Sequence, residues 1–494
     1  MRWKITIEGM DEFGGREAAE MVIEKEFSRL AKGEIGLTLS DGKTIMACLQ
    51  QLVVKQQCEA YVLTSRYCTD CQIFRRIKDS GKRKIRTVYG RVEVSNPRIM
   101  NCQRCLPYFC AASAVLRDIC PDQATSELME LSARMGSLMP YRKAADVLTE
   151  FLPTPSTESF MTLRHRTMKL GERLDEIARD RAWFEPPSSS EHKQGELDLP
   201  NDPKREFVVS IDTAHVRCSR SEKARIFEIA VARCGRGRRG SPPGHYFATA
   251  GTSKHELRAR TLQALQREGY VGQGELTVIS DGAEIMKRLP KALPKPTAHI
   301  LDWFHIAMKI QPLQQMADHI VRVNAGRNGP AISIADDIRS VKWKLWHGQT
   351  DRAIDRLEKI ITALAVQSRH ADVSAKRLLD LAQPLLTYVR SNRSAIVDYG
   401  ARHRSGRRIT SSLAESAVNS LVARRMVKKQ QMQWSLQGAH RILQVRAAVL
   451  NGDLSDRLAW QPLGLAASKA DASVSLGVDV RANPATAKSC MKPS

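Results

Sequence analysis

Hydrophobic residues form short continuous runs in the middle of the chain and recur at helical spacing elsewhere. Five runs rich in β-branched residues predict buried strands: 207–212, 225–232, 245–252, 276–280 and 297–301. Amphipathic stretches predict the helices that follow or separate them: 254–267, 283–289 and 303–316. Three strands in succession, followed by alternating helix and strand, predict an α/β domain with one mixed sheet.

Two of these predicted strands end in a carboxylate, Asp212 in the first and Asp281 directly after the fourth. The element order is that of an RNase H-like fold, in which the first and fourth strands are neighbours. Both aspartates should then meet at one sheet edge, as carboxylates that bind divalent cations do. For either residue alone, the alternative is a turn aspartate at a strand end.

A third carboxylate is expected on a later helix. Residues 206–316 would form the first part of the core, 317–405 an all-helical insertion, and 406–463 the final part. In that final part Glu415 lies at the start of a predicted helix and is the candidate third ligand. The alternative is a capping box made by Ser412 and Glu415.

The region before the core predicts a zinc ribbon. Two Cys-x-x-Cys pairs flank a predicted hairpin of strands 83–89 and 91–95 turning at Gly90, and four thiolates suit tetrahedral zinc: Cys68, Cys71, Cys102 and Cys105. Free thiols in a small core are the alternative, and Cys110 and Cys120 are less well spaced substitutes. We assign the ribbon to residues 63–121 and a helical segment to 1–62, with an amphipathic helix at Arg16–Lys32 and a polar break at Leu39–Gly42.

Residues 122–184 predict three helices with short turns, as in a helix-turn-helix: 123–137, 141–151 and 156–174. The third carries Arg164, Arg166 and Lys169, which suit phosphate or groove contacts. A plain three-helix connector is the alternative. The Pro- and Ser-rich stretch 185–205 predicts a linker, and the small, polar stretch 464–494 predicts a disordered tail.

Composition narrows the class of partner. The 494-residue chain has a formal charge of +24 and a pI near 9.8, which favours nucleic acid. A glycine-rich loop between predicted strands adds candidate contacts to the DNA backbone: Arg236, Arg238 and Arg239. The absence of a long apolar run and of a secretion signal predicts a cytoplasmic protein with no membrane segment, and the eleven cysteines suit a reducing compartment.

Several short motifs together resemble the Kra family of bacterial insertion-sequence transposases, relatives of the Mutator-like DDE enzymes. The matching segments follow one another from about Cys68 to Gly452: Asp212, Asp281-Gly-Ala283, Leu301-Asp-Trp-Phe-His305, Glu415-Ser-x-x-Asn419, Arg424-Arg-Met426 and Gln433-Trp-Ser-x-x-Gly-Ala439. The resemblance implies that Asp212, Asp281 and Glu415 are the DDE triad. It also matches Asp302 and His305 to the Asp/Cys-x-x-His signature that Mutator-like relatives have between the second Asp and the Glu.

The function implied is a transposase that binds the inverted repeats of its own element in double-stranded DNA, cuts there and joins 3′ ends to a target. Its cofactors would be Mg²⁺ or Mn²⁺ at the triad and Zn²⁺ at the ribbon. Cutting paired ends implies at least a homodimer in the bacterial nucleoid. A DNA-binding regulator that has lost catalysis and an RNase H-like nuclease remain alternatives.

Three further side-chain roles stay open at the level of sequence. Asp302 and His305 either support the active site or brace a helix start. Trp434 either stacks on an unpaired base or belongs to the core. Arg424 and Arg425 are candidate DNA contacts.

Overall fold

The structure is a computed structural model that describes residues 1–459 apart from these segments: 11–15, 29–32, 34, 109–110, 154–157, 182–205, 220–223, 239, 241–243, 252–253, 273, 284–285, 324–329, 369–372 and 427–431. The predicted linker at 185–205 and the predicted tail at 464–494 therefore lie outside the described residues. Within the described residues, no helix combines the length and the apolar character needed to cross a membrane.

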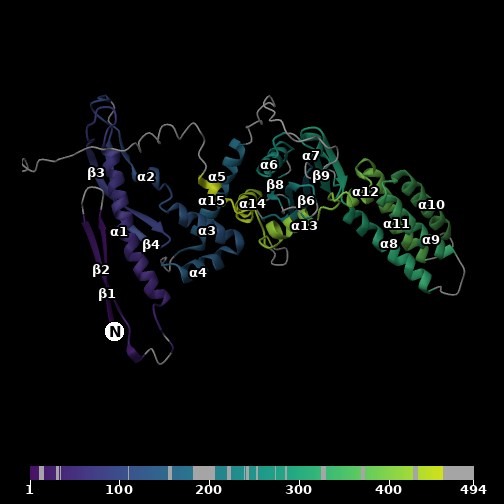
Figure 1. Cartoon of the computed structure of the whole chain (residues 1–494), viewed down its shortest axis with the longest axis horizontal. Coiled ribbons are helices and arrows are strands. Elements are labelled where there is room, and N and C mark those ends of the chain that lie inside the picture. The colour runs from purple at the N-terminus through teal and green to yellow at the C-terminus, as the bar shows by residue number, and fades with distance from the viewer. Residues whose placement is uncertain are drawn as a thin grey trace, which may run out of the picture.

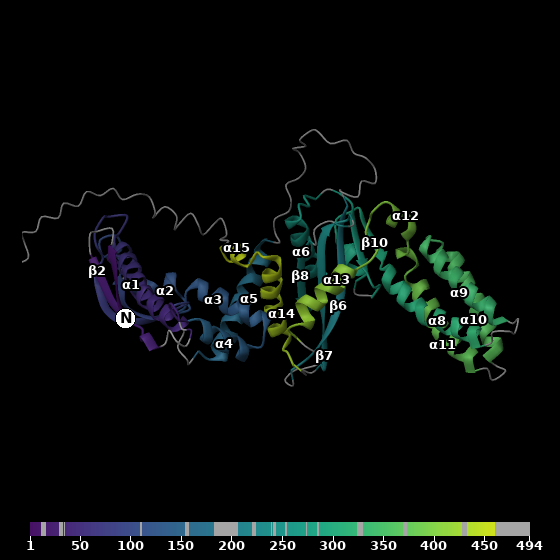
Figure 2. The same cartoon turned by 60° about the horizontal axis from the view of Figure 1, so that its bottom comes forward.

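The elements follow one another along an elongated molecule (Figure 1). The N-terminal hairpin and helix α1 lie at one end, the five-stranded sheet lies towards the middle, and the helices α8 to α11 lie at the other end. Figure 2 shows the same sequence of parts after a 60° rotation. The protein is thus a mixed α/β chain.

The first residues form a β-hairpin, so the prediction of a helical segment over 1–62 is wrong for its first third. Strands β1 (Arg2–Met10) and β2 (Arg16–Glu24) pair antiparallel. Apolar residues alternate with polar ones in both strands, for example Trp3, Ile5 and Ile7. This period of two lets one face of the hairpin pack on α1, and a helix would have scattered those side chains.

Helix α1 (Leu39–Arg66) begins where a polar break was predicted. Thr38 is its N-cap, and the side chains and backbone of Thr38 and Asp41 form a reciprocal capping box. The polar Leu39–Gly42 stretch thus starts the helix instead of interrupting one.

A three-stranded sheet follows, and it confirms the predicted hairpin. Strands β3 (Ile77–Thr87) and β4 (Gly90–Met100) turn through Gly90, whose φ of 116° favours glycine, and β5 (Ala112–Ala114) pairs with β4. Both long strands extend beyond the predicted bounds. The short helix α2 (Leu116–Ile119) comes next and contacts α1.

Three helices link this sheet to the core, as predicted: α3 (Ser126–Leu138), α4 (Tyr141–Phe151) and α5 (Phe160–Arg181). Thr125 caps α3 through its side chain, and α4 has the bounds predicted from the sequence. Helix α5 packs against α3 and also against α14 near the C-terminal end of the described chain.

The central sheet has the strand order β10-β9-β6-β7-β8. Its strands are β6 (Phe207–Arg217), β7 (Ile226–Arg236), β8 (His245–Ala250), β9 (Leu276–Ser280) and β10 (Thr297–Leu301). Strands β6, β7 and β8 are antiparallel, whereas β9 and β10 run parallel to β6. The predicted adjacency of the first and fourth strands is confirmed.

One face of this sheet is covered by α6 (Lys254–Arg267) and α7 (Arg288–Ala292). Phe207, Val209 and Ile211 pack there because alternate residues of a strand point to the same side. The helix predicted at 283–289 is displaced, since the chain turns at Met286 and Lys287 before α7 begins. The peptide bond between Lys295 and Pro296, just before β10, is cis.

The helical insertion begins as an extension of α8 (Trp303–Val323) beyond its predicted end. Its further helices are α9 (Pro330–Trp346), α10 (Thr350–Ser368), α11 (Val373–Ser391), a 3₁₀ turn at Arg393–Ala395 and α12 (Tyr399–Arg404). One continuous hydrophobic core joins these helices to Val208, Ile279 and Ile300 of the sheet. The insertion therefore packs directly on the sheet.

The chain then returns to the sheet through α13 (Ser412–Val418) and a π-helical turn at Asn419–Ala423. Helix α14 (Leu436–Asn451) and the short α15 (Leu454–Ala459) complete the described residues. Ala417, Leu421 and Ile442 pack on Ala214 and Ile229 of the sheet. Helices α13 and α14 thus cover the face opposite α6.

Candidate active site

The two predicted aspartates lie at the same edge of the central sheet. Strands β6 and β9 are paired in parallel from Phe207 and Leu276 to Ser210 and Ile279. Asp212 lies two residues beyond the last paired residue of β6, and Asp281 directly follows β9. The parallel register therefore brings both carboxylates to the carboxyl ends of neighbouring strands.

Glu415 approaches the same place from α13, which packs on β6 and β7. Every second residue of β6 points to the same face of the sheet. Asp212 shares that face with Val208 and Ala214, and α13 covers it. Burial raises the pKa of the Asp212 carboxyl above its ordinary value, and the negative charges of Asp281 and Glu415 raise that pKa further. Asp281 and Glu415 therefore both lie close enough to Asp212 for their charges to affect its pKa.

The start of α13 is held in place by residues far away in the sequence. The backbone N–H of Arg408 donates to the carbonyl of Gly237 at 3.1 Å, and that of Trp303 donates to the carbonyl of Ile409 at 3.1 Å. Ser411 is the N-cap residue but makes no side-chain cap. Its hydroxyl donates to Asp302 instead, so the alternative of a capping box at Glu415 is not realised.

Buried Asp302 and half-buried His305 form a pair at the start of α8, which agrees with the alternative that they brace a helix start. Asp302, 0% exposed, accepts from the backbone N–H of Phe304 at 2.7 Å with one oxygen. Its other oxygen accepts from Nδ1 of His305 at 3.0 Å and from Ser411. The bond to Asp302 raises the pKa of His305, and the charges of Asp281 and Asp212 add to this rise. The pair therefore caps the helix and also faces the acids.

The insertion contacts the site through a residue that sequence analysis missed. The hydroxyl of Tyr388 in α11 donates to the backbone carbonyl of Asp281 at 2.7 Å. Asn392 lies so close to Gly282 that a Cβ added at Gly282 would stand 2.7 Å from its side-chain oxygen. No local pattern marks either residue, since the contact spans more than a hundred positions of the chain.

The residue types at this edge are those that bind divalent cations, since carboxylate oxygens suit Mg²⁺ or Mn²⁺. The charges of Asp281 and Glu415 disfavour ionisation of Asp212. Within the described residues, however, the carboxylate oxygens of the three acids do not all lie within 4.8 Å of one another. His305 supplies a positive charge nearby when protonated, which partly balances the acids. A bound cation would remove the rest of that repulsion.

The four predicted zinc ligands lie together. Their sulfur atoms are all within 4.8 Å of one another, with Cys71 and Cys102 3.3 Å apart and Cys68 and Cys105 3.8 Å apart. Zinc–sulfur bonds of about 2.3 Å in a tetrahedron place sulfurs about 3.8 Å apart, so the cluster fits zinc. Backbone N–H donation, chiefly from Cys105, lowers the pKa of Cys102 to about 6, which favours the thiolate that binds metal. Contacts between the thiols raise the pKa of Cys71 and of Cys105 in the absence of an ion.

Cys120, one of the two alternative zinc ligands, is not part of the cysteine cluster. The thiol of Cys120 donates to the carbonyl of Ala124 at 3.2 Å in a buried position. Cys110 lies outside the described residues.

No protein-family model matches the chain, and no curated protein matches it. Among solved structures, the Drosophila P element transposase strand transfer complex is similar, with a TM-score of 0.33 and 13% identity over 67% of this chain and 93% of that chain. A similarity at that TM-score carries no argument about fold or function.

Two residues predicted to contact DNA are buried, and their prediction is wrong; Trp434 has the core position that was the alternative to base stacking. Arg166, 4% exposed, pairs with Glu158 at 2.6 Å. Arg425, 2% exposed, donates to the carbonyl of Gly136 at 3.0 Å and lies over the rings of Tyr141 and Trp434. Trp434, 8% exposed, packs in the core under α14, so it does not present its ring to a base.

The other predicted DNA contacts differ in accessibility. Arg164, Arg238 and Arg424 are exposed. Lys169 is exposed but paired with Asp122, and Arg236 is half-buried over the ring of Phe207. Arg239 lies outside the described residues.

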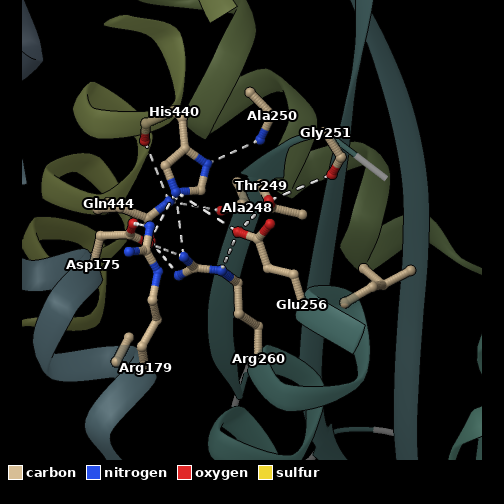
Figure 3. Close-up of polar contacts among 12 residues, drawn as sticks. Asp175, Arg179, Ala248, Thr249, Ala250, Gly251, Glu256, Arg260, His440 and Gln444 are labelled. Carbon is tan, nitrogen blue, oxygen red and sulfur yellow. Dashed lines mark hydrogen bonds and ion pairs between the residues drawn. The ribbon is translucent and has the colours of Figure 1, made fainter. Parts of the chain in front are cut away.

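A second cluster of polar side chains joins α5, α6 and α14 (Figure 3). Arg260 donates to Asp175, to Glu256 at 3.1 Å and to Gln444 at 2.6 Å. The Nδ1 atom of His440 accepts from the backbone N–H of Ala250 at 3.3 Å, so its Nε2 carries the hydrogen that points to Asp175 at 2.9 Å.

This second cluster brings Asp175, Glu256 and His440 close enough to hold a metal, yet its hydrogen bonds favour a structural role. A metal on Nε2 would need a hydrogen on Nδ1, where a backbone donor already points. The guanidinium of Arg260 also occupies the side of Asp175 and Glu256 that a cation would use. The cluster instead fastens the helical region before the core to the sheet.

Proposed function

We propose that the protein is a DDE-type transposase whose RNase H-like core cuts DNA at the ends of its own element and transfers the 3′ strands to a target. One observation carries the proposal. Two aspartates stand at the carboxyl ends of the adjacent parallel strands β6 and β9, and the charge of a glutamate on a helix after a long insertion raises the pKa of the first of them. The strand order of three antiparallel strands followed by two parallel ones supports the same fold.

In this proposal Asp212, Asp281 and Glu415 hold the metal ions through their carboxylate oxygens. The chemistry that Mg²⁺ or Mn²⁺ supplies in such a site is activation of a water or 3′-hydroxyl nucleophile and stabilisation of the leaving oxygen. Ser411 and His305 both bind the one oxygen of Asp302, which fixes α13 against the start of α8. Asp302 would thus set the distance between Glu415 and the two aspartates.

The regions before the core would bind the DNA. We assign this role to the zinc ribbon at 63–121 and the helical region at 122–184, with Arg164 as an exposed contact on α5. Arg238 and Arg424 extend the basic surface to the core itself. A phosphate-dominated interface makes end binding fall steeply as salt rises.

The test is a Mg²⁺-dependent cleavage assay on DNA that carries the inverted repeats flanking the element. Wild type should cut at the repeat boundary, and Asp281→Asn should bind the same DNA without cutting. Asp336→Asn, which changes an exposed acid of α9, is the matched control and should cut as wild type does.

Two outcomes would overturn the proposal. Full cutting by Asp281→Asn would remove this residue from the metal site. Sequence-specific binding by the wild type without cutting, in Mg²⁺ or in Mn²⁺, would favour a DNA-binding regulator instead.

A further inference from the structure

The outer edge of strand β1 has no strand partner among the described residues. Within the described part of the chain β1 pairs with β2 alone, in a two-stranded sheet. Helix α1 lies between this hairpin and the β3–β4 sheet, so the hairpin forms one end of the molecule (Figure 1). Unpaired strand edges are ready to pair with another strand, and most proteins cover or charge them.

The backbone groups on that open edge can be assigned. Met1 and Lys25 exchange both backbone hydrogen bonds, at 2.8 and 2.9 Å. Because bonded and non-bonded pairs alternate along an antiparallel ladder, Trp3, Ile5 and Ile7 also bond inward to β2. The even-numbered residues therefore point their N–H and C=O groups outward: Arg2, Lys4, Thr6, Glu8 and Met10.

This edge is complementary to itself. When two copies lie antiparallel with Thr6 opposite Thr6, every outward residue meets another outward residue, as a hydrogen-bonded ladder requires. Lys4 of each copy then faces Glu8 of the other, and Ile5 faces Ile7. Trp3, 48% exposed in the single chain, comes beside Gly9, whose Cβ position is taken by the side-chain amide of Gln56 in α1. Aromatic residues opposite glycine stabilise such pairs.

The edge of β2 lacks this complementarity. Its outward residues include Glu20 and Glu24, and the same symmetric arrangement places Glu20 against Glu20. Like charges directly opposite one another destabilise a strand pair. Ile23 of β2 is buried under α1 whereas Trp3 of β1 is not, so the β1 side is also the more accessible one.

We propose that two copies of this chain associate through β1, forming a four-stranded antiparallel sheet around a two-fold axis at Thr6. A two-fold contact of this kind closes on itself and stops at a dimer. One strand edge of nine residues buries less than the roughly 1,200 Å² of a stable complex, so the dimer should be reversible. The inference does not depend on the catalytic assignment.

Sedimentation velocity of the full-length, zinc-loaded protein without DNA, over a range of concentrations, tests the proposal. Wild type should pass from monomer to dimer. Thr6→Pro removes an outward donor from β1 and should weaken the dimer at least tenfold, whereas Ala18→Pro, at an outward position of β2, should leave it unchanged. Unchanged far-ultraviolet circular dichroism and zinc content in both variants establish that the chain is folded.

Several results would contradict it. A wild type that stays monomeric, or a Thr6→Pro variant that dimerises normally, excludes the β1 interface. Equal weakening by Ala18→Pro, or growth beyond the dimer, indicates pairing of β1 with the β2 of another copy.

Charge exchange gives a second test that does not alter the backbone. Within one chain Lys4 pairs with Glu20 at 2.7 Å, so Glu20 is first changed to Gln. In this Glu20→Gln background, Glu8→Lys should weaken the dimer. Adding Lys4→Glu should restore the dimer, because an acidic side chain of one copy then again faces a basic side chain of the other. Failure of the double variant to recover would overturn the Lys4–Glu8 pairing.

The register itself can be checked by oxidation. Cα atoms of a hydrogen-bonded antiparallel pair are about 5.5 Å apart, within reach of a disulfide. Thr6→Cys should therefore form a covalent dimer beyond the wild-type background. If Ile5→Cys forms one and Thr6→Cys does not, the two-fold axis lies at Ile5 and the proposed register is wrong.

Discussion

At the scale of single residues, Asp302 connects the start of α8 to the start of α13. Its two oxygens accept from Phe304, His305 and Ser411 while the side chain is fully buried. Burial alone would raise the pKa of Asp302, but these hydrogen bonds, chiefly that of His305, hold it below its ordinary value. The carboxylate therefore stays charged and keeps both α8 and α13 in position.

Asp302→Asn is expected to lower DNA cutting about 10- to 100-fold without abolishing end binding. The amide presents a donor where His305 or Ser411 needs an acceptor, so the position of Glu415 relaxes. Parallel cleavage and binding assays check this prediction. A variant that cuts at the wild-type rate would show that the geometry of α13 does not depend on Asp302, and Ser411→Ala should give a smaller loss.

At the scale of elements, the zinc ribbon joins two turns that the β3–β4 hairpin alone does not hold. Residues 68–71 and 102–105 each form a tight turn, with backbone bonds from Gln72 to Cys68 and from Leu106 to Cys102. The four thiols lie close enough to bind one metal ion, and binding it would supply folding free energy. Zinc should therefore hold the ribbon together.

Purified protein is expected to contain one zinc per chain, and Cys71→Ser should lose it. Atomic absorption measures the metal, and protease digestion should cut near residues 68–105 faster in the variant or after chelation. Cys48→Ser, which changes a half-buried thiol of α1 outside the cluster, should keep both the zinc and the protection. Equal zinc in Cys71→Ser would contradict the assignment.

The segment that follows α13 is held in place by a second helix. The buried guanidinium of Arg446 in α14 donates to the carbonyls of Leu421, at 2.6 Å, and of Ser420 and Ser137. It thereby satisfies carbonyls at the π-helical turn that no helix bond reaches. Burial lowers the pKa of Arg446 to about 10, so the group remains charged at neutral pH.

Arg446→Met keeps most of the side-chain volume but leaves these buried carbonyls without donors. We expect a loss of about 3 kcal/mol in the free energy of unfolding, because each unsatisfied buried acceptor costs roughly 1–3 kcal/mol. Urea unfolding followed by tryptophan fluorescence measures it. Arg441→Met, which removes a more exposed pair with Glu172 from the same helix, should cost less than about 1 kcal/mol.

At the scale of the whole molecule, the helical region before the core is fastened to the sheet by the cluster around Asp175. Its carboxylate lies among Arg260, His440 and Arg179, from α6, α14 and α5. Burial would raise the pKa of Asp175, but the bond from His440 and the charge of Arg260 outweigh it and bring the pKa to about 2. This carboxylate therefore stabilises the contact only while it is ionised.

Because the folded pKa lies below the ordinary value of about 4, the stabilisation is complete above that value and is lost as the pH falls towards 2. Asp175→Asn should thus unfold at lower urea than wild type at pH 7, with a gap that narrows as the pH falls from 4 to 2. Asp336→Asn serves as the exposed control. A gap that stays constant down to pH 2 would mean that the charge of Asp175 does not stabilise the junction.

Local patterns in the sequence determined the strands of the central sheet, the start of most helices, the aspartates at the strand ends and the paired cysteines. Each of these depends on neighbouring residues, through side-chain period, capping or short spacing, so a single segment contains the information. The pairing of β6 with β9 followed from the order of elements alone.

Only the tertiary structure decided which basic and aromatic residues face solvent. Arg166 and Arg425 look like DNA contacts in the sequence, but they are buried because partners from α3, α4 and the segment before α5 close over them. For Trp434 the sequence left base stacking and the core open, and the structure places it in the core. The contact of Tyr388 with Asp281 was missed for the same reason. The N-terminal hairpin was missed although the alternation of apolar and polar residues in β1 and β2 is a local strand pattern. Burial and pairing depend on residues distant in the chain, and local propensity does not contain their positions.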